Sequence, residues 1–289
     1  MSDAPSPAAA GPRQLSVVSG DGVALAGEEA GHGAAVVLLH GITATRRYVV
    51  MGSRTLERSG HRVIAYDARG HGRSAPAPDP TAYGYERLAA DLADVLAAAG
   101  IERALLAGAS MGAHTAVRFA LEHPERVAAL AIITPAFDPE ARTGDADFAG
   151  WDALARGLRE GGVEGFVSAY DLSALPESFR ATVATVLRQR LSAHEHPGAV
   201  ADALEVVPRS RPFESFAELS AIAVPTSVVA SRDEADPGHP LAVGERYARA
   251  IPGARLVVED AAAPPRSPIA WQGGQLSRIL AELASDAST

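Results

Sequence analysis

The chain has 289 residues, of which 47% are hydrophobic, and its 35 acidic against 26 basic residues give a net charge of -9. This length allows one large α/β domain or two smaller ones, and the negative charge argues against nucleic acid or an anionic membrane as partner. The absence of cysteine excludes disulfides, thiolate metal sites and a cysteine nucleophile.

The first 13 residues, MSDAPSPAAAGPR, have no apolar segment behind a basic start. We therefore predict a disordered tail at 1–13 and no signal peptide. The longest apolar runs, such as Val127–Ile133, are far too short to span a bilayer. We expect a cytoplasmic protein that acts on a small-molecule substrate. The sequence leaves its oligomeric state open.

From residue 14 onward, short apolar runs alternate with amphipathic patterns, which predicts a mostly parallel, doubly wound α/β sheet. The predicted strands are Leu15–Ser19, Val23–Glu28, Ala35–Leu39, Val63–Tyr66, Ala104–Ala107, Val127–Ile133, Thr226–Ala230 and Arg255–Val258. The predicted helices are Tyr85–Ala99, Met111–Glu122, His239–Ala250 and Gln275–Ala284. The turn Gly20–Gly22 between the first two strands indicates a hairpin.

The strand signal disappears from Pro139 to about Ala221. Helical patterns at Trp151–Glu160 and Phe179–Leu191 fill this gap, and they are broken by Gly161-Gly162 and by a proline. An insertion of this length is too long for a bare loop. We predict a helical cap at 139–221 over one edge of a core made of 14–138 and 222–289.

The clearest chemical signal is the pentapeptide GASMG (residues 108–112), which follows a predicted strand and leads into a helix. G-x-S-x-G in this context is typical of a serine nucleophile. A serine in such a tight turn projects its oxygen away from the backbone, and the glycines relieve crowding. We therefore predict Ser110 as nucleophile and the N–H of Met111 as an oxyanion donor.

With this pentapeptide, three further motifs resemble the α/β-hydrolase family, over about Leu15 to Leu283. His40-Gly41 resembles the family's oxyanion loop, which implies the N–H of Ile42 as second oxyanion donor. YDARGHGRS (66–74) resembles the loop after the next strand, and VVASRDEADP (228–237) the strand and loop that carry the acid. The resemblance implies the α/β-hydrolase fold, and the serine disfavours the dehalogenase and epoxide-hydrolase branches, whose nucleophile is aspartate.

The resemblance places the triad acid at Asp233, just past a predicted strand end. Glu234 and Asp236 are neighbouring alternatives. Asp138 is a second option, because some members carry the acid after the preceding strand. The acid's task is to orient the base that takes the serine proton.

The family's histidine follows the last strand in a stretch such as D-A-G-H, but the corresponding letters here are DAAA (260–263). No histidine occurs from Glu259 to the end of the sequence. His239, the only histidine after Asp233, lies in the predicted acid loop and is ranked first as base. His114, one helical turn beyond Ser110, is ranked second.

Other side chains are assigned by position. His194 and His196 lie in the predicted cap, where either one of them stands above the serine or both belong to a solvated loop; the solvated loop is the preferred interpretation. Arg266, Ser267 and Trp271 occupy the loop that lacks the histidine, and they line either the pocket or the surface. The predicted substrate-binding residues are His40, His114, Trp151 and Trp271.

These motifs predict a serine-dependent hydrolase or acyl transferase that acts on a small carboxylic ester, thioester or lactone. Because the expected histidine is missing, two alternatives stay open. One is a non-hydrolytic lyase, cyclase or isomerase that uses the oxyanion donors without a full triad, and the other is a small-molecule-binding module. No metal-ligand cluster or dinucleotide fingerprint is present in the sequence, so we expect neither a metal nor a cofactor.

Overall fold

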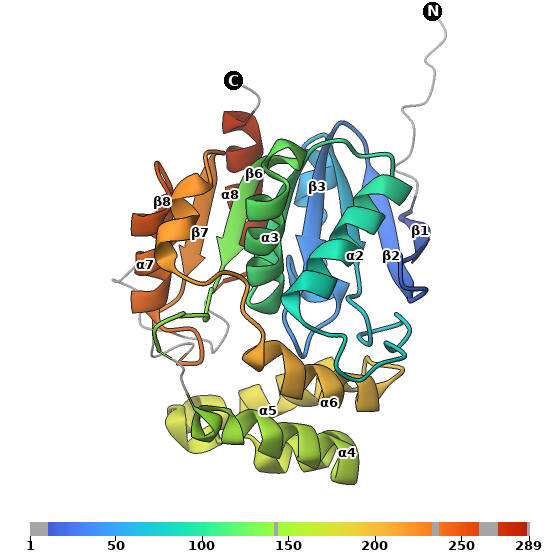
Figure 1. Cartoon of the computed structure of the whole chain (residues 1–289), viewed down its shortest axis with the longest axis vertical. Helices are drawn as coiled ribbons and strands as arrows, with labels where there is room; N and C mark the ends of the chain where they lie inside the picture. The colour runs from blue at the N-terminus through green and yellow to red at the C-terminus, as the bar shows by residue number, and fades with distance from the viewer. Residues whose placement is uncertain (1–10, 142–143, 233–236, 260–270, 288–289) are drawn as a thin grey trace, which may run out of the picture.

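The computed structural model describes residues 11–141, 144–232, 237–259 and 271–287. At its centre is an eight-stranded sheet in the order β1-β2-β4-β3-β5-β6-β7-β8 (Figure 1). The strands are β1 Arg13–Val18, β2 Ala24–Gly31, β3 Ala34–Leu39, β4 His61–Tyr66, β5 Ala104–Ala109, β6 Val127–Ile133, β7 Thr226–Ala230 and β8 Arg255–Val258. Strands β3 to β8 run parallel, whereas β2 pairs antiparallel with β1 and β4. The predicted mostly parallel sheet is confirmed.

Helices cover both faces of this sheet. One face packs against α2 (Tyr85–Ala98), α3 (Met111–Glu122) and α7 (Leu241–Ala250), and the other against α1 (Thr55–Arg58) and α8 (Gly273–Asp286). In β3, Val37 and Leu39 belong to the first apolar cluster, whereas Val36 and Leu38 belong to the second. Strands buried on both faces have continuous apolar sequences, which is why the sequence identifies them.

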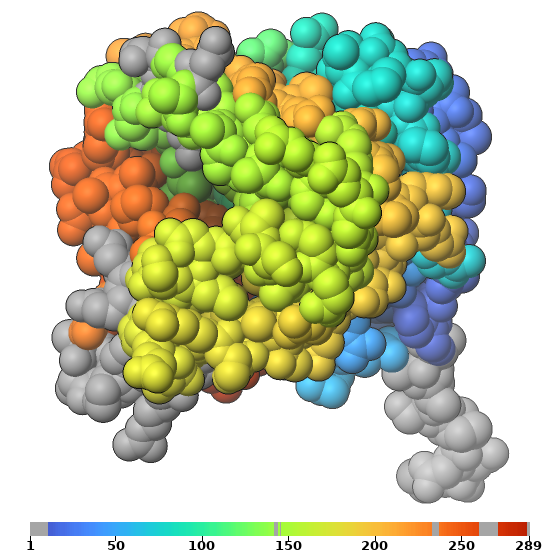
Figure 2. Space-filling model, turned by 90° about the horizontal axis from the view of Figure 1, so that it is seen from below, coloured from blue at the N-terminus to red at the C-terminus, as the bar shows by residue number. Residues whose placement is uncertain are grey.

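Between β6 and β7 the described residues form only helices and connecting turns, and we call residues 139–221 the helical insertion. Its elements are α4 Ala149–Ala169, α5 Glu177–Leu191 and α6 Pro197–Val206, with short 3-10 helices η3 Asp145–Phe148, η4 Leu172–Ala174, η5 Val207–Arg209 and η6 Phe216–Ala221. Helices α4, α5 and α6 lie beyond the C-terminal ends of the parallel strands (Figure 1), whereas η6 packs against α3 and α7 beside the sheet. Seen from that side, side chains of α4 and α5 cover the middle of the molecule (Figure 2).

Several element ends differ from the prediction; helix α7, for example, begins at Leu241 and not at His239. Three further differences concern the tail, the break in α4 and a missed helix. Strand β1 begins at Arg13, which pairs in register with Glu29, so the predicted tail extends one residue too far. Helix α4 continues past the expected break, although Gly162 interrupts its helical backbone at φ 60° and ψ -145°. Helix α6 was not predicted, because Pro197 and Gly198 resemble a loop. Proline at the first helical position needs no hydrogen-bond acceptor.

The two remaining 3-10 helices are η1 (Arg46–Tyr48) and η2 (Pro124–Arg126). Within the described ranges, no helix combines the length and the apolar character needed to cross a membrane.

Candidate active site

Ser110 occupies the sharp turn between β5 and α3. Its backbone has φ 51° and ψ -115°, a conformation that residues other than glycine rarely adopt. A Cβ atom at Gly108 would lie 2.1 Å from the oxygen of Gly112, and one at Gly112 would lie 2.2 Å from the oxygen of Leu39. Only glycine therefore fits on either side of the serine. The turn is held by the N–H of Ser110, which donates to the Ile133 oxygen at 2.9 Å.

His239 lies against this serine. Its Nε2 atom is 2.9 Å from the Oγ atom of Ser110, although 129 residues separate the two in sequence. The contact arises because the loops after β5 and β7 emerge at the C-terminal ends of parallel strands that have only β6 between them. A ring nitrogen at this distance can accept the hydroxyl proton.

His114 is turned away from the nucleophile. Its Nε2 accepts hydrogen bonds from the N–H groups of Ala136 and Phe137, both at 3.1 Å. The proton of the neutral ring is then on Nδ1, which lies 2.9 Å from the hydroxyl oxygen of Tyr85. With both ring nitrogens engaged in the protein interior, His114 has the geometry of a structural residue and not that of a base for Ser110.

The loop that carries the predicted oxyanion donor passes close to the serine. A Cβ atom at Gly41 would lie 3.4 Å from the Cβ of Ser110, which places the two residues side by side. Ile42 follows in this loop. Met111 is the first residue of α3, and the N–H groups of a first helical turn have no acceptor within the helix. Both residues border a small cavity of about 50 Å³ together with Ser110.

Two buried histidines hold this loop in place. The ring of His40 lies with Nδ1 2.8 Å from the Gly41 oxygen, and its Nε2 accepts from the N–H of Ala68 at 2.9 Å. The Nε2 of His71 lies 2.6 Å from the Ile42 oxygen. Burial, and next the nearby His71, hold the pKa of His40 well below its usual range. His40 lines neither cavity that contains Ser110, so its contacts are those of a positioning residue.

His194 was expected in a solvated loop, and the structure corrects this. It is buried, and its Nδ1 accepts from the N–H of Gly72 at 2.8 Å while its Nε2 lies 3.2 Å from the Thr43 oxygen. Burial, followed by the neighbouring His71, lowers its pKa to about 4. His194 therefore joins the helical insertion to two core loops. His196, in contrast, is exposed.

A cavity of about 370 Å³ opens beside Ser110 and His239. A volume of this size suits a small ligand. The insertion contributes part of its wall, and the other walls come from loops at the sheet edge. Its described lining residues are Gly41, Ala44, Tyr48, Val49, Met51, Ala109, Ser110, Ile133, Thr134, Val186, Gln189, Arg190, Ser231, His239, Trp271 and Leu276.

Two larger hollows lie away from the nucleophile, and their described lining contains neither Ser110 nor His239. The larger, about 930 Å³, is an open groove between α4 and α6. Arg159 in this groove pairs with Asp202 at 2.7 Å, and Arg209 pairs with Asp152 at 2.8 Å. Charges neutralised in this way make the groove a weaker candidate than the smaller cavity at Ser110.

Comparison with known proteins identifies the family. The family model described as alpha/beta hydrolase fold matches residues 34–264. The chain belongs to the α/β-hydrolase family. A 2-hydroxy-6-oxononadienedioate/2-hydroxy-6-oxononatrienedioate hydrolase 2 of Pseudomonas putida is 32% identical over 238 residues, which cover 77% of this chain and 78% of the relative.

Solved structures lead to the same family. A thermophilic esterase from Thermogutta terrifontis is 27% identical, with a TM-score of 0.74 over 96% of this chain and 100% of the esterase. An alpha/beta hydrolase from Sphaerobacter thermophilus is also 27% identical, with a TM-score of 0.66 over 93% of this chain and 99% of that one. The chain is therefore an α/β-hydrolase enzyme.

The predicted acid of this α/β hydrolase, Asp233, lies outside the described residues, as do Glu234 and Asp236. Asp138 is described, and its Oδ2 pairs with Arg246 of α7 at 2.6 Å. Asp138 was the second option for the triad acid, and this ion pair engages its carboxylate with α7.

The segment where the α/β-hydrolase family has its histidine, with Arg266 and Ser267, also lies outside the described residues. Its neighbours are described on both sides. The side chain of Glu259 accepts from the N–H of Arg232 at 2.6 Å, which ties the end of β8 to the start of the loop after β7. The ring of Trp271 donates to the Ala230 oxygen at 3.2 Å and lines the 370 Å³ cavity. Trp151 and His114 line the smaller cavity instead.

Proposed function

We propose that the protein is a serine-dependent hydrolase or acyl transferase that acts on a small carboxylic ester, thioester or lactone. The observation that carries this proposal is the 2.9 Å separation between the Nε2 of His239 and the Oγ of Ser110. A nucleophile with a base in hydrogen-bond reach is the arrangement that covalent acyl transfer requires. It favours this chemistry over a lyase, cyclase or isomerase without a base at the serine.

The proposed reaction has two steps. His239 takes the proton of Ser110, whose Oγ forms a bond to the carbonyl carbon; the N–H groups of Ile42 and Met111 stabilise the oxyanion. The bond to the leaving group breaks, and the leaving group departs with the proton from His239. Water then attacks the acyl-enzyme and gives a proton to His239, which returns it to the Ser110 oxygen as the acid is released.

Other parts of the site have supporting roles in this proposal. Asp233 is assigned to orient His239, as the family motif implies. Trp271 contacts the substrate in the cavity of about 370 Å³. Trp151 and His114 contact it in the cavity of about 50 Å³. His40 holds the oxyanion loop and does not touch the substrate. The helical insertion acts as a cap that excludes water from the pocket.

The test combines labelling with turnover of p-nitrophenyl butyrate. A fluorophosphonate probe should form an adduct on Ser110, located by mass spectrometry, and Ser110→Ala should lose the adduct and at least about 10³-fold in kcat/KM. Ser192→Ala, an exposed serine at the end of α5, serves as control and should keep both. Circular dichroism checks that each variant is folded.

A folded wild-type protein that forms no adduct, or near-normal turnover by Ser110→Ala, would contradict the nucleophile assignment. That outcome would favour the non-hydrolytic enzyme or the small-molecule-binding module.

A further inference from the structure

The oxyanion loop, residues 40–45, is buried, and three of its successive carbonyl oxygens each face a different histidine ring. The distances are 2.8 Å from the Gly41 oxygen to the ring of His40, 2.6 Å from the Ile42 oxygen to His71, and 3.2 Å from the Thr43 oxygen to His194. His40 belongs to the loop itself and His71 to the loop after β4. His194 comes from the helical insertion, which therefore contacts the backbone of the oxyanion loop directly.

The partners of His194 determine which ring nitrogen carries the proton. Its Nδ1 accepts from the N–H of Gly72 at 2.8 Å, so this nitrogen has no proton in the neutral ring. The proton is on Nε2, which donates to the Thr43 oxygen. Burial lowers the pKa of His194 to about 4, which keeps the ring neutral at pH 7.

The backbone beside His194 also holds the ring in place. The N–H of Glu195 donates to the Gly72 oxygen at 2.9 Å. Both backbone polar groups of Gly72 are therefore bound by two consecutive residues of the insertion. This pairing fixes the position from which the ring of His194 reaches the oxyanion loop.

The bond from His194 continues through the loop as a chain of hydrogen bonds. A peptide group is planar and trans, so its C=O and N–H point in opposite directions. The Thr43 carbonyl shares a peptide group with the N–H of Ala44, which donates to the Gly41 oxygen at 2.9 Å. The Gly41 carbonyl shares a peptide group with the N–H of Ile42. Two linked peptide groups therefore join the ring of His194 to that N–H.

The N–H at the far end of this chain is open. Ile42 is buried, and its N–H has no hydrogen-bond acceptor within the part of the chain that the structure describes. Buried N–H groups without an acceptor are rare in proteins. This N–H is the one that the proposed function assigns to the oxyanion.

We propose that His194 is a positioning residue for the oxyanion loop, through which the docked helical insertion orients and polarises the N–H of Ile42. The inference rests on the proposed function, because it concerns the same oxyanion donor. Hydrogen bonds in a chain polarise and strengthen one another. A stronger donor at Ile42 stabilises the transition state, in which the oxyanion is charged, more than the bound ester. His194 itself does not touch the substrate.

Two variants separate the two hydrogen bonds of His194. His194→Asn keeps an acceptor near Nδ1 and loses the donor to Thr43, whereas His194→Gln has a donor near Nε2 and loses the acceptor for Gly72. With p-nitrophenyl butyrate, kcat of His194→Asn should fall by about tenfold at a KM within about twofold of the wild type, a part of the effect of a whole oxyanion donor. His194→Gln should keep kcat within about threefold, although it is less stable to urea.

A transition-state analogue gives a readout that a purely structural role would not change. Butaneboronic acid forms a bond from boron to the Oγ of Ser110 and becomes tetrahedral and anionic, while the serine proton passes to His239. Its inhibition constant should rise in His194→Asn by the factor by which kcat/KM falls. Circular dichroism checks that each variant is folded.

Glu195→Gln is the matched control. This neighbouring side chain is 57% exposed and pairs with Arg73 at 3.5 Å, so it joins the same two segments at the surface. The variant should keep the wild-type kcat and the wild-type inhibition constant.

Amide NMR of the unliganded protein separates failure of the inference from failure of the proposed function, because it needs no turnover. The amide proton of Ala44 should move upfield in His194→Asn, as the chain of hydrogen bonds weakens, and should stay near its wild-type position in His194→Gln. This shift in a protein without esterase activity would support the chain and reject the hydrolase function. Its absence would reject the chain, and equal losses of kcat in the two variants would overturn the positioning role.

Discussion

His239 approaches Ser110 from a segment of the chain that differs from the one where the family has its histidine. The base is usually on the loop after the last strand, whereas here a ring nitrogen 2.9 Å from the nucleophile comes from the loop after β7. This loop also contains the predicted acid. If acid and base share one loop, a change in its conformation would affect both groups together.

Replacement of His239 tests this position. His239→Ala should lower kcat/KM for p-nitrophenyl butyrate by about 10²- to 10⁴-fold, the usual contribution of a general base. The measurement is kcat/KM of both proteins at the same pH, with circular dichroism to check that the variant is folded.

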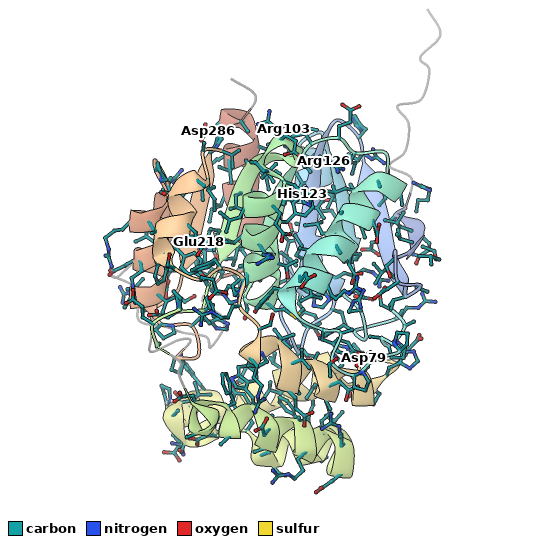
Figure 3. The ribbon with its side chains drawn as sticks, in the orientation of Figure 1. Asp79, Arg103, His123, Arg126, Glu218 and Asp286 are labelled. Atoms are coloured by element: carbon teal, nitrogen blue, oxygen red, sulfur yellow. The ribbon has the colours of Figure 1, made fainter. Side chains whose placement is uncertain are left out.

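His123→Ala is the control for this experiment, because His123 is 44% exposed and lies at the C-terminal end of α3, opposite to Ser110 and far from α4, α5 and α6 (Figure 3). This variant should keep the wild-type kcat/KM. A kcat/KM in His239→Ala equal to that of the wild type would remove His239 as the base and strengthen the non-hydrolytic alternative.

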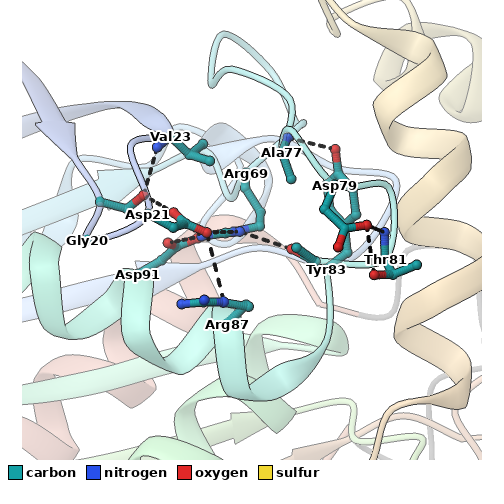
Figure 4. Close-up of polar contacts among 12 residues, drawn as sticks. Gly20, Asp21, Val23, Arg69, Ala77, Asp79, Thr81, Tyr83, Arg87 and Asp91 are labelled. Carbon is teal, nitrogen blue, oxygen red and sulfur yellow. Dashed lines mark hydrogen bonds and ion pairs between the residues drawn. The ribbon is translucent and has the colours of Figure 1, made fainter.

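At the scale of elements, a buried ion cluster connects α2 to the hairpin and to the loop after β4 (Figure 4). Arg69, only 1% exposed, donates to both carboxylate oxygens of Asp91 at 2.8 and 2.6 Å and to Asp21 at 2.9 Å. The hydrogen bond from Arg69 holds the pKa of Asp21 well below its usual range. Burial raises the pKa of Asp91, against the effect of the same arginine.

Removal of one partner should be far more harmful than removal of both. Asp91→Ala leaves a buried guanidinium with less compensation and should lower the free energy of unfolding by about 3–5 kcal/mol. The double variant Arg69→Met, Asp91→Leu should recover much of this loss, because the two fully buried charges are removed together and the remaining carboxylate of Asp21 is 22% exposed to water. Urea denaturation followed by circular dichroism gives the values.

The exposed pair between Arg188 and Glu164 provides the comparison, and Glu164→Ala should change the free energy of unfolding by less than about 1 kcal/mol. Equal losses for Asp91→Ala and Glu164→Ala, or a double variant worse than the single one, would contradict the account of the buried cluster.

At the scale of the whole molecule, the helical insertion is joined to the core at the buried His194. The ring lies between two core loops, and the His71 ring centroid is 5.6 Å away. Protonation would place a charge in this interior. The pKa of about 4 means that the folded protein resists that charge.

This predicts a stability that depends on pH. Between about 4 and the ordinary value of 6.5, the unfolded chain binds the His194 proton and the folded protein does not. Stability is therefore complete above 6.5 and decreases as pH falls, with about 2–3 kcal/mol from this residue between pH 7 and 4.5. His194→Asn, which keeps an acceptor for Gly72, should remove that part of the loss.

The measurement is the urea midpoint at the two pH values for the wild type, His194→Asn and the exposed control His196→Asn. The control should follow the wild type. If His194→Asn shows the full wild-type loss of stability between the two pH values, protonation of His194 is not the cause of that loss.

Features coded by neighbouring residues were predictable from sequence. Apolar runs buried on both faces gave strands such as Thr226–Ala230 with the observed bounds. The glycine spacing around Ser110 predicted the turn. The steric crowding there arises mainly from residues within the same pentapeptide, with Leu39 of the neighbouring strand β3 as the one distant contact. Helix α6 was missed, since its burial depends on the core it packs against and not on a regular apolar period.

Only the tertiary structure decided the contacts between segments that are distant in sequence. The sequence named His239 and His114 as possible bases, but the choice depends on which ring reaches Ser110, and that is set by the strand order. His194 has no local motif; its role comes from the packing of the insertion against loops more than a hundred residues away. The sequence determines the turn and the sheet through local sterics and apolar patterning, whereas the pocket forms only when separate segments meet.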